Sequence, residues 1–241
     1  DALDMTTGVY DSPSFEADEN SDDTDAFFNA ETHAQKIDFA CRHYHHKAAP
    51  GVRWVYRTSD AYVLGTAMQA FARRRLGPDA DLYDTLLAGQ LWRPEHLSPP
   101  MMSTLRTRDA VRQPLVGFGL TYHPDDAVRL ARFLAVDKGK IGGEPMLDET
   151  MLRRALQRDP QHRGMLAGEP GFDYVDGVWG RDLAPVLKCG APAWTPFMSG
   201  YGGISIVMLA GDVQYYYFGD SQVWDWSPAA VEINKLRPIC R

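Results

Sequence analysis

Two short apolar runs near the C-terminus place the strongest constraint on the fold. Residues 203–209 and 213–218 are rich in β-branched and aromatic side chains, and the turn-forming triplet Ala210-Gly211-Asp212 separates them. This pattern predicts a β-hairpin, and hence antiparallel strands, because so short a connection does not allow the crossover that parallel strands require. A further strand is predicted over 175–179.

The middle of the chain follows the helical period instead. The clearest predicted helix covers 60–76, where apolar residues recur at i, i+3, i+4 and i+7 and form one face. These residues are Leu64, Ala67, Met68 and Phe71. Ser59 or Asp60 is expected to cap the start of this helix, and Gly77-Pro78 is expected to end it.

Further helices are predicted on both sides of this segment. One is predicted over 25–44, with a looser period, and another begins at its cap Asp81 and turns Leu82, Leu86, Leu87 and Leu91 inward. A third begins at Asp125 or Asp126 and is stopped by Gly139. Two more are predicted over 148–156 and 226–236. Helices in the middle and hairpin strands at the end predict an α+β fold, with helices packed on an antiparallel sheet. We expect a mainly helical lobe over 1–170 and a sheet hairpin with a closing helix over 171–241, together one structural domain.

Charge and composition exclude several classes of protein. The 241 residues are 44% apolar with a net charge of −7, which is typical of a globular chain with one large core or two small ones. The only basic run is Arg73-Arg74-Arg75, so nucleic acid is not expected as a partner. No apolar run reaches the ~20 residues of a membrane helix. The first residues show no signal peptide, so a leader was either removed or never present.

Neither the cysteines nor the acidic residues predict a metal site. Cys41, Cys189 and Cys240 form no Cys-x-x-Cys pair, which disfavours structural zinc. In an oxidising compartment two of them could pair, and the third would be a buried free thiol or would pair with a segment outside this chain. The loop predicted over 12–25 contains Asp18-x-Asn20-x-Asp22, which mimics the start of a calcium loop. Asp23 and Asn29 occupy the places of the required Gly and Glu.

Histidines cluster in one place, at His43-Tyr44-His45-His46. Neighbouring residues point apart on a helix or a strand, so His45 and His46 cannot easily converge on one ion. A surface cluster is the favoured interpretation. We therefore expect no metal and no cofactor.

One block of residues indicates a class of reaction. Tyr56-Arg57-Thr58 stands directly before the predicted helix, followed in register by Asp60 and Val63-Leu64-Gly65. It resembles the second active-site motif of the serine β-lactamase and penicillin-binding-protein superfamily. The match is best with the esterase-like and 6-aminohexanoate-oligomer-hydrolase branch, which reads Tyr-x-Ser where class C enzymes read Tyr-x-Asn. The resemblance implies that Tyr56 is the catalytic base and that Thr58 contacts the substrate amide; packing statistics alone would make Tyr56 a core aromatic.

A second block precedes the predicted hairpin. Ser199-Gly200-Tyr201-Gly202-Gly203-Ile204 resembles the family's Lys-Thr-Gly or His-x-Gly segment, where small residues let substrate lie against the backbone and a main-chain N–H completes the oxyanion hole. The resemblance implies that Tyr201, Gly202, Gly203 and Ile204 bind substrate. Tyr201 stands where a cation is common, which disfavours recognition of a β-lactam carboxylate, although esterase-like branches carry uncharged residues there. The alternative is a glycine-rich strand entry without chemistry.

Two other segments agree with this order of motifs. Residues 1–9 resemble the family's Leu-Leu-x-Met-x-Ser-Gly segment. The helix that starts at Pro124-Asp125-Asp126, with Gly139 and Ile141-Gly142-Gly143 after it, resembles a structural helix of the family and the glycine segment that follows it. The resemblance thus extends from residue 1 to about residue 220.

The nucleophile of that family is missing from this chain. The family carries it in Ser-x-x-Lys, where one helical turn brings the amine beside the hydroxyl. Three places before the six lysines stand His33, Tyr44, Ala135, Asp137, Pro185 and Glu232. Gly-x-Ser-x-Gly is absent as well, so the chain has no recognisable nucleophile.

The resemblance implies a β-lactamase-like fold, an antiparallel sheet flanked by helices with an inserted helical lobe, that lacks its N-terminal strands and its nucleophile helix. We expect another polypeptide, the N-terminal part of the same gene product, to complete it. The expected function is a serine hydrolase that acts on a small-molecule amide or ester through an acyl-enzyme. The alternative is a binding or regulatory relative that has lost the chemistry. The family is usually exported, which implies a periplasmic or secreted location.

Overall fold

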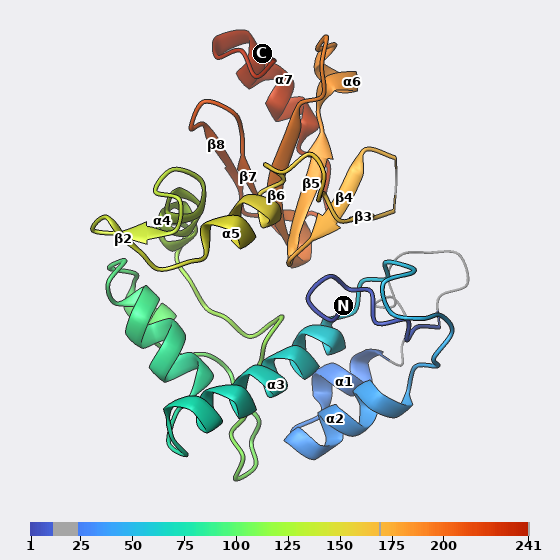
Figure 1. Ribbon diagram of the computed structural model, residues 1–241, viewed down its shortest axis with the longest axis vertical. Coiled ribbons are helices and arrows are strands. Elements are labelled where there is room, and N and C mark those ends of the chain that lie inside the picture. The colour runs from blue at the N-terminus through green and yellow to red at the C-terminus, as the bar shows by residue number, and fades with distance from the viewer. Residues whose placement is uncertain (12–23, 169, 241) are drawn as a thin grey trace. The chain divides into compact units, whose positions relative to one another are not determined.

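The computed structural model describes residues 1–11, 24–168 and 170–240 of the chain (Figure 1). Within it the chain forms two compact units, Asp1–His123 and Pro124–Arg241, and each is considered by itself below. The acidic loop predicted over 12–25, with its calcium-like pattern, lies outside the described residues except for Thr24 and Asp25, where the first helix begins.

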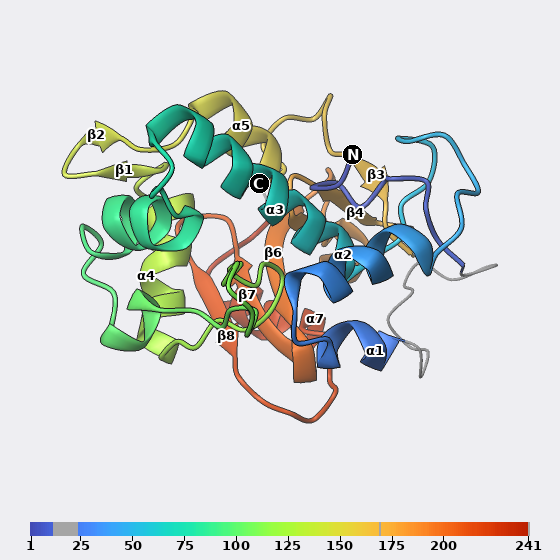
Figure 2. The same ribbon diagram turned by 90° about the horizontal axis from the view of Figure 1, so that it is seen from below.

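The first unit is helical. Its elements are α1 (Thr24–Asn29), α2 (His33–Arg42), α3 (Thr58–Leu76), the π-helix η1 (Leu82–Trp92) and the 3₁₀-helix η2 (Pro99–Met102). The single helical stretch predicted over 25–44 is two helices that pack side by side (Figure 2). The break follows from a capping box, in which Thr32 accepts a hydrogen bond from the Gln35 N–H and the Gln35 side chain bonds back to Thr32.

A buried aromatic cluster holds these helices together. The Phe27 ring of α1 lies 5.9 Å from the Tyr62 ring of α3 and 5.9 Å from the Phe118 ring, measured between centroids. Phe27 and Tyr62 are almost completely buried. The core of this unit therefore joins α1, α3 and the segment that follows η2.

Helix α3 is tied to η1 by buried polar contacts. The Gln69 side-chain amide donates to the Ala80 carbonyl at 2.8 Å and accepts from the Leu82 N–H at 2.7 Å. Asp81 caps η1, as predicted, by accepting the N–H groups of Tyr83 and Asp84. Gly77 ends α3, also as predicted.

The second unit contains a six-stranded antiparallel sheet in the order β3-β4-β5-β6-β7-β8. Its elements are α4 (Pro124–Ala135), β1 (Lys140–Ile141), β2 (Glu144–Pro145), α5 (Glu149–Ala155), β3 (Met165–Leu166), β4 (Phe172–Val175), β5 (Val178–Asp182), α6 (Ala184–Leu187), β6 (Trp194–Gly200), η3 (Tyr201–Gly203), β7 (Ile204–Met208), β8 (Gln214–Tyr217) and α7 (Ser227–Leu236). The predicted α+β class with an antiparallel sheet is confirmed. Residues 124–168 and 170, assigned above to the mainly helical lobe, lie in this second unit.

The hairpins of the sheet confirm one strand prediction and correct another. The predicted C-terminal hairpin exists, with Met208 opposite Gln214. The strand predicted over 175–179 is wrong, because the chain reverses at Asp176-Gly177 and pairs Val175 with Val178. Both turn residues have positive φ, 51° and 83°, as a tight hairpin turn requires.

Helices cover both faces of the sheet in the second unit. Helix α7 and the segments around it bury one face, in a cluster made of Leu183, Phe197, Val207, Leu209, Trp226, Ala230 and Ile239. Side chains alternate along a strand, so Ile206 and Met208 point to the other face, where α4 lies against β7. Arg181 of β5 closes the first cluster, stacking on Phe172 and Trp226 and pairing with Asp225 at 2.7 Å.

A disulfide joins Cys189 to Cys240, and Cys41 is a free, exposed thiol. The expectation that two of the three cysteines could pair is thus met, while the third thiol is exposed and not buried. No helix in the described part of the chain combines the length and the apolar character of a bilayer-spanning segment.

Candidate functional site

The Tyr-x-Thr block lies at the N-terminal end of α3. Thr58 is the first residue of the helix and is 5% exposed. Tyr56, two residues earlier, is half-buried, with its ring centroid 6.4 Å from that of Trp54. Both residues therefore belong to the N-terminal end of α3, the longest helix in the described residues, and such an end favours negative charge.

The start of α3 differs from the predicted capping. Arg57, in extended conformation, occupies the N-cap position, and no side chain among the described residues caps the helix there. Asp60, one of the two predicted caps, is engaged elsewhere. Its carboxylate accepts hydrogen bonds from the Arg57 guanidinium and, at 3.0 Å, from the Thr7 hydroxyl. Ser59, the other predicted cap, lies inside the first turn and is buried.

Arg57 and Asp60 form a buried ion pair inside the block. Both residues are at most 4% exposed, and the guanidinium also contacts the Thr7 hydroxyl at 3.2 Å and the Tyr44 ring, 4.5 Å from its centroid. Burial raises the pKa of Asp60, although Arg57 and Thr7 favour its charged form. The pair fixes the backbone between Tyr56 and Thr58, because Arg57 is the residue between them.

A glycine lets a loop approach the start of α3. A Cβ at Gly117 would lie 3.0 Å from the Ala61 Cβ and 3.1 Å from the Thr58 Cγ2, and Gly117 has φ +96°. Only glycine combines this backbone with such a close contact. The segment around Gly117 thus forms one wall beside Thr58.

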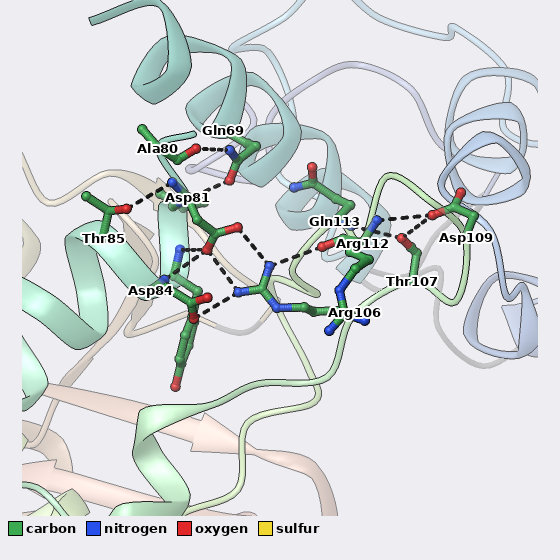
Figure 3. Close-up of polar contacts among 12 residues, drawn as sticks. Gln69, Ala80, Asp81, Asp84, Thr85, Arg106, Thr107, Asp109, Arg112 and Gln113 are labelled. Carbon is green, nitrogen blue, oxygen red and sulfur yellow. Dashed lines mark hydrogen bonds and ion pairs between the residues drawn. The ribbon is translucent and has the colours of Figure 1, made fainter. Parts of the chain in front are cut away.

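Arg106 anchors this loop to η1 (Figure 3). Its guanidinium donates two hydrogen bonds to Asp81, at 2.8 and 2.9 Å, contacts Asp84 at 3.0 Å and donates to the Arg112 carbonyl at 3.1 Å. Burial alone would raise the pKa of Asp81, but the hydrogen bonds from Arg106 hold it below its usual value. One arginine therefore couples the cap of η1 to the loop.

Asp109 anchors the same loop to α2. It accepts the Thr107 hydroxyl at 2.8 Å (Figure 3). Its second oxygen accepts the His33 N–H at 2.7 Å. His33 Nδ1 lies 2.8 Å from the buried Tyr62 hydroxyl. Burial, with a contribution from Asp109, raises the pKa of Tyr62, so this hydroxyl stays protonated.

The second block forms the turn between β6 and β7. Tyr201 is 85% exposed, whereas Gly202 and Gly203 are buried and have φ of +83° and +97°. Ile204 begins β7 and pairs with Gly200. The two glycines thus form a tight turn that no other residue type adopts easily.

The chain's own segment 219–223 lies against these glycines. The Gly202 carbonyl accepts the Gln222 N–H at 3.0 Å. A Cβ at Gly203 would overlap the Val223 carbonyl and lie 2.9 Å from the Val223 nitrogen, and one at Gly202 would lie 2.8 Å from the Gly219 oxygen. The missing side chains therefore make room for this segment, a requirement that exists whether or not substrate binds here.

The predicted site residues fall into two groups, one in each unit. Tyr56 and Thr58 come together at the start of α3, and Tyr201, Gly202, Gly203 and Ile204 come together at the β6–β7 turn. Sequence reasoning missed the Arg57–Asp60 pair, although opposite charges three residues apart near a helix start are a readable signal. It also missed Gly117, whose role depends on a contact distant in sequence.

Lys36 is a further residue that sequence reasoning did not single out. Its side chain is buried, and Nζ donates to the Phe27 carbonyl at 2.6 Å and lies over the rings of Phe27 and Phe118, 4.7 and 5.2 Å from their centroids. Burial lowers its pKa to about 8. The amine holds the last turn of α1, since Phe27 is two residues from the end of that helix.

The histidine cluster gives no metal site among the described residues, where no three His, Cys, Asp or Glu side chains are placed to hold one ion. His45 and His46 are exposed, and His45 pairs with Asp11 at 2.8 Å.

Comparison of the sequence with models of known protein families and with curated proteins gives no match.

Proposed function

We propose that this chain is part of a serine hydrolase related to the β-lactamases, acting on an amide or ester. The observation that carries the proposal is the Tyr-x-Thr block at the start of a 19-residue helix. In this arrangement Tyr56 is the base toward a serine hydroxyl, and Thr58 offers a hydroxyl to the substrate amide. An acyl-enzyme forms on the serine, and water then releases it.

The second block supplies the remaining parts of the proposal. A main-chain N–H of Gly203 or Ile204 donates to the oxyanion, and Tyr201 borders the substrate. Tyr201 carries no charge, which supports an uncharged ester or amide and not a β-lactam with its carboxylate.

The nucleophile comes from another polypeptide segment in this proposal. The sheet offers a place for it, because β8 is the last strand and, among the described strands, pairs with β7 alone. An unpaired strand edge is a template for a further strand. The proposed partner is the N-terminal part of the same gene product, which adds strands at this edge and brings a Ser-x-x-Lys helix.

An exported location is part of the proposal. It is supported by the Cys189–Cys240 disulfide, since disulfides persist in oxidising compartments and are rare in the cytosol. The proposed enzyme is therefore a periplasmic or secreted hydrolase.

One observation favours the non-catalytic alternative. Segment 219–223 occupies the space beside Gly202 and Gly203 that a substrate backbone would need. A binding or regulatory relative that keeps the scaffold would retain these glycines for packing alone.

Labelling of the full gene product with a fluorophosphonate separates the two functions. The hydrolase is expected to give a single labelled serine outside this chain, and a burst of nitrophenol from p-nitrophenyl acetate. Tyr56→Phe is expected to lower the acylation rate by about 10²- to 10⁴-fold, because it removes the base. Tyr174→Phe, in β4 and away from the β8 edge, is the matched control and is expected to keep the rate.

Two results would count against the hydrolase. One is the absence of labelling in a preparation of the full gene product. The other is an intact-mass measurement that gives a single folded monomer of 27.0 kDa as the natural form, because such a chain has no partner segment to supply the serine.

A further inference from the structure

Helix α3 turns its apolar face outward. Of the predicted apolar face, Ala67, Met68 and Phe71 are exposed, Met68 and Phe71 by 45% and 51%. The side of α3 that the unit buries consists instead of Thr58, Ser59, Asp60, Tyr62, Gly65, Gln69 and Ala72. Leu64, the fourth residue of that face, is half-buried, so three of the four are left exposed by the part of the chain that the structure describes.

Specific contacts hold α3 in this orientation. Gly65 fits against Val116, whose side chain a Cβ would overlap, and the Gln69 amide is bonded to Ala80 and Leu82. Turning the helix to bury Phe71 would break these contacts and expose a buried amide. The outward face is therefore a fixed feature of the unit.

Arg74 and Arg75 continue this face at the C-terminal end of α3, because they follow Phe71 by three and four residues. Arg73, Arg74 and Arg75 are exposed and form no ion pair with any described residue. The guanidinium groups of Arg74 and Arg75 lie over the Phe71 ring, 5.7 and 5.3 Å from its centroid. The partial negative charge at the C-terminal end of a helix favours cations there, but this effect does not explain why the Phe71 ring beneath the arginines is exposed.

We propose that this surface, defined as Ala67, Met68, Phe71, Arg74 and Arg75 and called the α3 patch, docks an acidic polypeptide segment with apolar side chains from a partner protein. Guanidinium groups bind carboxylates through paired hydrogen bonds, and Phe71 and Met68 offer an apolar contact beside them. The patch spans two helical turns, about 12 Å, which matches a short peptide segment.

The charge of the whole chain argues for a peptide over other anionic partners. The net charge is −7, and the patch holds only two cations. Tight binding to nucleic acid draws on many phosphate contacts, and an anionic membrane surface repels the rest of an acidic protein. A short peptide segment interacts only with the positive charge of the patch, because salt screens the negative charges of the protein that lie more than about 8 Å away. The proposal is independent of the hydrolase function.

Binding of the full chain to two acidic polymers tests the proposal that the α3 patch docks an acidic segment. Random poly(Glu,Tyr) in a 4:1 ratio carries carboxylates and apolar rings, and poly-glutamate carries carboxylates alone. We expect poly(Glu,Tyr) to bind more tightly, and binding of both polymers to fall as sodium chloride rises from about 0.05 M to about 0.5 M. Met68→Ser/Phe71→Ser is expected to weaken poly(Glu,Tyr) about tenfold and to leave poly-glutamate unchanged.

The arginines have a complementary test. Arg74→Glu/Arg75→Glu is expected to lower the affinity for both polymers by about tenfold or more. Arg129→Glu/Arg153→Glu, at two exposed arginines of the second unit, is the control with comparable charge change and is expected to bind normally. All these side chains are exposed, so circular dichroism and melting temperature should match the parent protein.

Three results would overturn the proposal. The first is no binding of poly(Glu,Tyr) at low salt, or equal binding by all variants. The second is a dimer in sedimentation that Met68→Ser/Phe71→Ser abolishes, which would make a second copy the occupant. The third is binding to phosphatidylglycerol vesicles, but not to the polymers, that depends on the same residues.

Discussion

The residue with the greatest local effect is Arg57, because its charge is buried beside the proposed base. Removing one partner of a buried pair leaves the other charge without compensation. Arg57→Ala is expected to destabilise the protein by about 3–5 kcal/mol in urea unfolding. Arg57→Met/Asp60→Leu, which removes both charges and keeps the volume, is expected to lose much less. Equal losses for the two variants would show that packing, and not charge, explains the effect.

Lys36 gives a pH dependence whose sign follows from its burial. The folded protein releases this proton near pH 8, whereas the unfolded chain keeps it up to about pH 10.5. Between these values the unfolded state binds more protons, so the free energy of unfolding contributed by Lys36 rises with pH. The rise is about 3 kcal/mol across the window.

Urea unfolding between pH 7 and pH 11 measures this contribution. The difference between the parent protein and Lys36→Met isolates it, since all other groups titrate in both. We expect the parent to gain stability relative to Lys36→Met as the pH increases above 8. A flat difference would mean that the amine titrates normally in the folded state.

At the scale of the element, the β6–β7 turn depends on its glycines. Gly203→Ala places a Cβ against the Val223 main chain and strains a positive φ, so we expect a loss of about 1–3 kcal/mol in thermal unfolding. Gly190→Ala is the matched control, because nothing lies within 4 Å of its Cβ position and its φ is ordinary. A similar loss at both positions would contradict the close approach of segment 219–223.

Element boundaries were predictable where a local signal acts alone. Gly77 ends α3, Asp81 caps η1, and the hairpin at Ala210-Gly211-Asp212 forms, because each depends on neighbours in the chain. The strand predicted over 175–179 failed because the Asp176-Gly177 turn signal lay inside an apolar run. The cap predicted for α3 failed because Asp60 bonds to Thr7, a residue distant in sequence.

At the scale of the whole molecule, the disulfide closes the second unit. Cys189 and Cys240 are 51 residues apart, and a link of this length is expected to contribute about 4 kcal/mol by restricting the unfolded chain. Cys189→Ser/Cys240→Ser, or reduction with dithiothreitol, should lower the melting temperature. Cys41→Ser is the control and should leave it unchanged, since that thiol is free. An unchanged melting temperature after confirmed reduction would contradict a structural role.

The candidate site was predictable only in part. Tyr56, Thr58 and the Tyr201–Ile204 turn were found from motif order, and local signals place them at a helix start and a strand entry. The residues that surround these positions could not be predicted from the sequence. Gly117 beside Thr58 and Val223 beside Gly203 are contacts between segments far apart in sequence.

The sequence by itself determined the class of the fold, since helical and strand periods, caps and turns act over a few neighbouring residues. It also determined that three arginines and a regular apolar face share one helix. Only the tertiary structure decided which side of that helix is buried. The contacts of Gln69 and Gly65 hold this orientation, because turning the helix to bury Met68 and Phe71 would leave the Ala80 carbonyl and the Leu82 N–H without Gln69 and would remove the close fit of Gly65 against Val116.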